Sequence, residues 1–136
     1  METRQRHQPP GETSGSPERP AQRLAALTLQ FDLAHEIDEI LHEDIWQRSD
    51  RNSKTLVKEP FLHVVLTALK AGARLDRHQT EGPVALHGLR GKVRISALGD
   101  TVELGPGRLL AIEAGVPHEA EATEESVFLI TLGWPR

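Results

Sequence analysis

Two spacings of hydrophobic residues divide the chain into a helical part and a strand part. Between Asp32 and about Arg48 the apolar residues recur every three or four positions, which is the spacing of one helix face. They are Leu33, Ile37, Ile40, Leu41 and Ile45. Asp32 suits a helix N-cap, because its carboxylate can accept hydrogen bonds from the first backbone N–H groups. The pattern predicts one amphipathic helix, which Trp46 seals against the rest of the domain or against a partner subunit.

After Arg48 the segment SDRNS is typical of a turn, and from there onward apolar and polar residues alternate. The alternating segments are short, rich in β-branched residues and separated by turns that contain Gly, Pro or Asp. The predicted strands are Lys54–Glu59, Phe61–Leu69, Pro83–Arg90, Lys92–Ala97, Thr101–Leu104, Arg108–Glu113, His118–Thr123 and Ser126–Leu132. Because the intervals leave almost no room for crossover helices, the pattern predicts an all-β antiparallel sandwich or barrel.

The N-terminal residues 1–22 almost lack large apolar side chains and are rich in Pro, Gly, Ser, Glu and Arg. Such a segment buries too little apolar surface to offset the entropy that it would lose on ordering. We therefore expect three parts: a disordered tail (1–22), an N-terminal helical segment (23–53) and a β-barrel (54–136).

Charge and composition exclude several classes of protein. The net charge is −4, so the chain lacks the basic face that nucleic-acid binding needs, and no polybasic stretch would hold it on a membrane. Because there is no cysteine, disulfides, thiolate metal sites and a cysteine nucleophile are excluded. The apolar run Leu24–Leu29 is too short for a signal peptide or a membrane span. We expect a cytoplasmic protein with no nucleic-acid or membrane partner.

Two further spacings carry the candidate chemistry. The first contains, in order, Gly72, His78, Thr80 and Gly91. The second contains, in order, Gly107, Glu113, Gly115 and His118. Glycines at such places suit tight connections, which need a positive φ or a close approach of the backbone.

Together the two spacings resemble the two conserved sequence blocks of the cupin superfamily, over about Leu62 to Leu132. The first block there runs Gly, five residues, His, any residue, His, three or four residues, Glu, six residues, Gly. The second block carries a glycine before the sequence that here reads Val116-Pro117-His118, the most specific fragment of the match. The resemblance implies a cupin-type double-stranded β-helix, a jelly-roll barrel, and a homodimer.

The metal-binding members of that family hold one ion with two histidines and a glutamate of the first block and a histidine of the second. The matching positions here are His78, Thr80, Val84 and His118. A threonine hydroxyl is a poor ligand for a divalent transition metal and valine is none, whereas catalytic zinc or non-haem iron usually takes three protein ligands. The resemblance therefore implies an incomplete metal site of His78 and His118, with a divalent transition metal as the one cofactor it suggests.

A neighbouring residue could supply the missing donor. Glu81 is nearest in sequence, and His63 lies on an earlier strand whose register the sequence leaves open. If His118 points inward, strand alternation turns Glu119 and Glu121 outward. By the same rule His87 points outward if Val84 and Leu86 line the cavity.

We expect His78 and His118 to share a cavity in which Thr80 is a third polar point. Val84 and Leu86 would line it, with Val65 and Phe128 as further apolar wall. This set describes a ligand-binding cavity for a small molecule better than it describes a hydrolytic centre. The alternative is that the two histidines are inward side chains that bond to each other, to Thr80 or to water.

Three functions from different classes follow from these residues. The first is a binding module: a metal-free cupin homodimer whose pocket holds a small molecule. The second is a metal-dependent enzyme of dioxygenase or isomerase type that uses His78 and His118, for which the warrant is fold analogy alone. The third is a structural or interaction dimer, in which the segments Leu27–Phe31 and Lys54–Val57 cross to a partner and protect exposed sheet edges.

Overall fold

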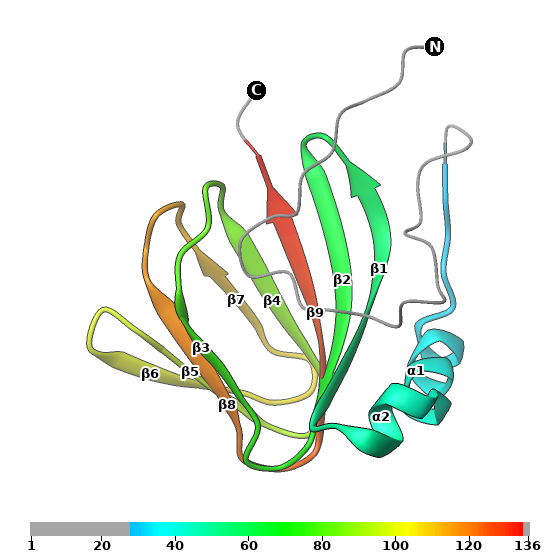
Figure 1. Cartoon of the computed structure of the whole chain (residues 1–136). Helices are drawn as coiled ribbons and strands as arrows, with labels where there is room; N and C mark the ends of the chain where they lie inside the picture. Colours follow the sequence, from blue (N-terminus) through cyan, green and yellow to red (C-terminus); the bar gives the residue numbers. More distant parts are fainter. Residues whose placement is uncertain (1–27, 135–136) are drawn as a thin grey trace.

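The computed structural model describes residues 28–134, which form two helices and two antiparallel sheets (Figure 1). The elements are α1 (Leu33–His42), α2 (Asp44–Arg48), β1 (Arg51–Glu59), β2 (Leu62–Leu69), β3 (Arg74–His78), β4 (Val84–Arg90), β5 (Val93–Ala97), β6 (Asp100–Leu104), β7 (Leu109–Ile112), β8 (His118–Ala122) and β9 (Ser126–Gly133). The five-stranded sheet has the order β1-β2-β9-β4-β7, and the four-stranded sheet has the order β3-β8-β5-β6. The predicted all-β jelly-roll fold with an N-terminal helical part is confirmed.

The main core lies between the two sheets and follows from the alternation of side chains along each strand. On β9, Phe128, Ile130 and Leu132 face the four-stranded sheet and are at most 5% exposed. Val127 and Leu129 point to the opposite face of the same strand, toward the helices. The four-stranded sheet covers one face of β9 and the helices cover part of the other, so both faces contribute apolar side chains to a core.

A second core joins the helices to the outer face of the five-stranded sheet. Ile37, Ile40 and Trp46 pack there against Leu56 of β1 and Leu66 of β2. Trp46 is 6% exposed, so its predicted sealing of the helical part against the barrel is confirmed. None of the helices in residues 28–134 is both long enough and apolar enough to cross a membrane.

The prediction of one continuous helix is wrong, because the helical part breaks at Glu43. Glu43 is extended (φ −73°, ψ 152°), so α1 ends at His42 and α2 starts at Asp44. The Asn52 side-chain amide donates to the Ile40 carbonyl and to the Glu43 carboxylate, both at 2.8 Å. Asn52 on β1 thus provides a hydrogen-bond donor for a backbone carbonyl in the last turn of α1. The pattern of apolar residues along the helix does not reveal this long-range contact.

The strands also differ from prediction in three places. β1 starts at Arg51, inside the segment that we predicted to be a turn, three residues before the expected start of the barrel part. β3 was missed entirely, because its sequence RLDRH has one apolar residue and pairs with a single neighbour, β8. Residues 28–31 form no strand, so the expected strand over Leu27–Phe31 is wrong for the described positions. The expected tail (1–22) lies outside the described residues.

Candidate functional site

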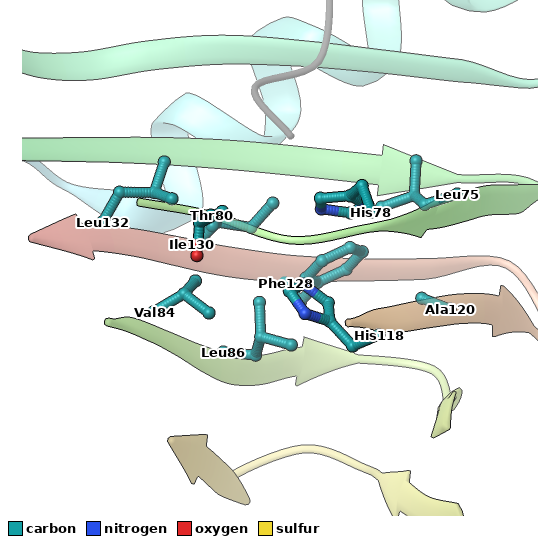
Figure 2. Close-up of a pocket in the computed structure, with 10 residues that line it drawn as sticks. All are labelled: Leu75, His78, Thr80, Val84, Leu86, His118, Ala120, Phe128, Ile130 and Leu132. Carbon is teal, nitrogen blue, oxygen red and sulfur yellow. The ribbon is translucent and has the colours of Figure 1, made fainter. Parts of the chain in front are cut away.

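The site is built on two neighbouring strands of the four-stranded sheet. β3 and β8 pair antiparallel, and their register places His78 directly opposite His118. Side chains opposite each other in an antiparallel pair lie on the same face, so both imidazoles point to the inside of the barrel. The ring centroids are 4.5 Å apart and the ring planes are inclined by 60° (Figure 2).

Each imidazole is held in one tautomer by a backbone carbonyl two residues earlier in the chain. His78 Nδ1 lies 2.8 Å from the Asp76 carbonyl oxygen, and His118 Nδ1 lies 3.0 Å from the Val116 carbonyl oxygen. A carbonyl only accepts hydrogen bonds, so each Nδ1 carries the proton and donates it. In the neutral rings both Nε2 atoms therefore keep a free lone pair, and neither has a hydrogen-bond partner among residues 28–134.

His118 is the deeper of the two histidines. The residue is 6% exposed, whereas His78 is half-buried at the mouth of the site. Burial lowers the pKa of the His118 imidazole; the hydrogen bond to Val116 opposes this, and the neighbouring His78 lowers the pKa further. His118 is therefore a neutral hydrogen-bond acceptor at pH 7.

The cavity beside the two rings is small and mostly apolar. Its volume is about 20 Å³, which is close to what one water molecule needs. It is lined by Leu75, His78, Thr80, Val84, Leu86, His118, Ala120, Phe128, Ile130 and Leu132 (Figure 2). The structure thus brings together all five residues that the sequence singled out for ligand binding. Of the two further wall residues expected, Phe128 lines the cavity, while Val65 lies in the core around it.

Thr80 is buried and its hydroxyl is engaged. The hydroxyl donates to the Gly82 carbonyl oxygen at 2.8 Å, and the residue is 3% exposed. Gly82 allows this loop to lie against the end of β9, since a Cβ at this position would come within 1.7 Å of the Gly133 carbonyl oxygen. Thr80 therefore offers the cavity only its oxygen lone pairs.

The residues that could have completed a metal shell are occupied elsewhere. Glu81 accepts a hydrogen bond from the Trp134 indole at 3.2 Å. Glu119 and Glu121 pair with Arg74 on the outside of the four-stranded sheet, as strand alternation predicts.

The two other histidines of the barrel also lie away from the site. His63 is on the inner face of β2, but its ring packs 5.2 Å from that of Trp134. His87 is on β4 between Leu86 and Gly88 and points to the opposite face from the cavity. Within residues 28–134 no three His, Cys, Asp or Glu side chains converge on one point. The donor set of two imidazoles, an engaged hydroxyl and a valine does not fit a transition-metal centre.

Four wall residues were missed by the sequence reasoning: Leu75, Ala120, Ile130 and Leu132. The last two could have been found, because they follow Phe128 at intervals of two on the same strand. Ala120 follows His118 by the same rule. Leu75 could not have been found, since its strand was not recognised.

Known proteins resemble this chain in structure, whereas no protein-family model matches the sequence and no curated protein matches it significantly. A conserved protein of unknown function from Streptococcus pyogenes is similar with a TM-score of 0.62 and 26% identity, over 69% of this chain and 87% of that one. A cupin superfamily protein from Desulfitobacterium hafniense is similar with a TM-score of 0.61 and 16% identity, over 62% of this chain and 78% of that one.

A larger protein contains the same fold as one part. Salicylate 1,2-dioxygenase from Pseudaminobacter salicylatoxidans is similar with a TM-score of 0.66 and 16% identity, over 73% of this chain. This chain spans 33% of that protein's length. At this identity the likeness concerns the fold alone.

Proposed function

We propose that this domain, which has the fold of a small cupin, is a binding module whose barrel cavity receives a polar group of a small molecule between His78 and His118. The protein would act as a homodimer without a resident metal. The observation that supports the proposal most is the pair of facing imidazoles, whose Nδ1 atoms are both engaged by backbone carbonyls and whose Nε2 atoms are both free.

The geometry limits the chemistry of the ligand. Two neutral Nε2 atoms accept hydrogen bonds, so the group that enters should be a donor such as a hydroxyl. The cavity of about 20 Å³ is far below the roughly 300–1,000 Å³ of drug-sized pockets, so only this group enters while the rest of the ligand lies at the mouth. Half-buried His78 borders that mouth. A small alcohol or phenol fits these requirements.

The same two imidazoles favour a second candidate, a metal-dependent enzyme of dioxygenase or isomerase type. Two free Nε2 atoms are half of a four-ligand shell, and cupins host many unrelated activities. Against this candidate stand Thr80, whose hydroxyl is engaged, and Val84, which has no donor atom. A purely structural dimer remains the third candidate, and it assigns no role to the free Nε2 atoms.

The test combines a ligand titration with metal analysis, both on full-length protein purified without an affinity tag. Phenol is titrated while the imidazole resonances of His78 and His118 are followed by NMR, with toluene as the matched compound that lacks the hydroxyl. We expect saturable shifts of both imidazoles with phenol and weaker or no shifts with toluene. His118→Phe should abolish the shift of the remaining His78 imidazole, whereas His87→Phe, on the other face of β4, should retain the shifts of both.

Three results decide between the candidates. A stoichiometric transition metal in the purified protein, lost in His118→Phe and kept in His87→Phe, overturns the proposal in favour of the enzyme. Equal responses to phenol and toluene overturn the role of the Nε2 acceptors. A strict monomer in light scattering at micromolar concentration overturns the homodimer and the structural candidate with it.

A further inference from the structure

A second and larger cavity lies where the two sheets end side by side. β7 is the last strand of the five-stranded sheet and β6 is the last strand of the four-stranded sheet. In Figure 1 the β5–β6 hairpin extends from the side of the molecule away from α1 and α2. Between this hairpin, β7 and the loop that follows β7, the structure has a cleft of about 280 Å³. This volume is close to the lower end of small-molecule pockets, roughly 300–1,000 Å³.

The walls of the cleft are apolar. Ile95 and Val102 lie opposite each other on β5 and β6, and Leu110 and Ile112 face them from β7. Leu98, in the turn of the β5–β6 hairpin, also lines the cleft although it is 79% exposed. Covering such a concave apolar surface with a ligand removes it from water, which favours binding.

The charged groups at the cleft are carboxylates. Asp100 lies at the start of β6 and Glu113 directly after β7, and both line the cleft and are exposed. Among the described residues, no Lys, Arg or His lines it. Neither carboxylate has an ion-pair or hydrogen-bond partner for its side chain among residues 28–134. The cleft therefore combines apolar walls with two uncompensated negative charges, which complements a cation on an apolar body.

The rim of the cleft also contains a strained residue. Leu98 has φ +53°, the left-handed region that a branched side chain rarely adopts, and it is followed by Gly99 at φ +81°. Asn or Gly would suit this position of a two-residue hairpin turn better. A leucine that is both strained and exposed costs the fold free energy, and here it adds an apolar side chain to the cleft wall.

We propose that this cleft binds a small organic cation, an amine carried on a short apolar group, with its ammonium group between Asp100 and Glu113 and its apolar body against Leu98, Val102 and Leu110. The site is distinct from the pair of histidines. In the strand register Asp100 lies opposite Ala97, which in turn lies opposite His118, so two strand spacings separate the two sites on one face of the sheet.

The experiment is an NMR titration of the full chain with three compounds that share one apolar body: benzylammonium, benzyl alcohol and benzoate. Backbone amide shifts locate the binding. We expect saturable shifts over Asp100–Leu104 and Leu109–Glu113 with benzylammonium, affinity for benzyl alcohol about three- to tenfold weaker, and no saturable binding of benzoate. Exposed ion pairs are worth little each, and this sets the modest size of the difference.

Variants test whether the two carboxylates of the cleft, and not charge in general, bind the cation. Asp100→Asn with Glu113→Gln should reduce the benzylammonium affinity to that of benzyl alcohol, because both side chains keep their size and are exposed. Glu124→Gln with Glu125→Gln removes the same charge outside the cleft and should leave the affinity within twofold. Leu98→Asn should weaken all binding in the cleft, since it removes part of the wall.

Three outcomes overturn the proposal: no saturable shift with benzylammonium, equal binding of all three compounds, or benzylammonium shifts centred on His78 and His118. The last of these leaves the histidine cavity as the binding site. Failure of phenol to shift the histidines while benzylammonium binds the cleft overturns the histidine site alone. The two proposals therefore fail independently.

Discussion

Protonation of His118 should destabilise the fold at mildly acidic pH. The residue is 6% exposed and its ring lies 4.5 Å from that of His78. Burial lowers the pKa of its imidazole in the folded state, whereas in the unfolded chain the same group titrates near its ordinary value of about 6.5. Below about pH 6.5 the unfolded state therefore binds more protons than the folded state, and stability falls as the pH is lowered.

The size of the effect follows from linkage. One proton contributes at most about 1.4 kcal/mol of unfolding free energy per pH unit, between the unfolded pKa and the lower folded pKa. Above about pH 7.5 the contribution is constant. Replacement of His118 by phenylalanine removes the titratable group. It also leaves the Val116 carbonyl without its hydrogen-bond donor, at a cost of about 1 kcal/mol in unfolding free energy.

Urea unfolding of the wild type and His118→Phe between pH 8 and pH 5 measures this contribution. We expect the variant to be less stable by about 1 kcal/mol at pH 8, and the gap to close or reverse toward pH 5. His87→Phe, on the opposite face of β4, should follow the wild type at every pH. A gap between the wild type and His118→Phe that is constant, or that widens toward acid, would refute the reasoning.

Three other substitutions, the first with a matched control, test the packing and the strain. Lys54→Met should cost about 2 kcal/mol in urea unfolding, because Lys54 is 7% exposed and bonds Glu36 and Glu39 at 2.5 and 3.1 Å, and its loss leaves the half-buried Glu36 unpaired. Lys92→Met removes an exposed lysine 3.9 Å from Glu103 and should cost under about 0.5 kcal/mol. Equal costs would contradict the burial of Lys54. Phe128→Ala should cost about 3–5 kcal/mol and enlarge the histidine cavity, which a crystal structure of the variant would reveal. Leu98→Asn should raise the unfolding free energy by about 1 kcal/mol, since Asn tolerates the left-handed region; a loss of stability would contradict the strain at Leu98.

Much of the fold could be predicted from local patterns. Most strands could be recognised as short apolar or alternating segments between turns that contain Gly, Pro or Asp, because their side chains contribute to a core. The spacing that leads to His78 and the spacing that leads to His118 end on paired strands, and the register places these residues opposite each other.

The rest depends on contacts between residues distant in sequence. The break at Glu43 is fixed by Asn52 in β1, and no helical pattern contains that contact. β3 is an edge strand with one apolar residue, so it lacks the alternation by which strands are recognised. The small volume of the histidine cavity follows from how Phe128 and Leu86 pack, and the cleft at β6 and β7 follows from where each sheet ends.

The tautomers of His78 and His118 test the central claim most directly, and long-range ¹H–¹⁵N NMR of the imidazoles in untagged protein at pH 7.5 measures them. The account predicts that both rings carry their proton on Nδ1 and that both Nε2 nitrogens are unprotonated and shift when phenol is added. Protons on both Nε2 atoms would contradict it, because the rings would then present donors, not acceptors, to the cavity.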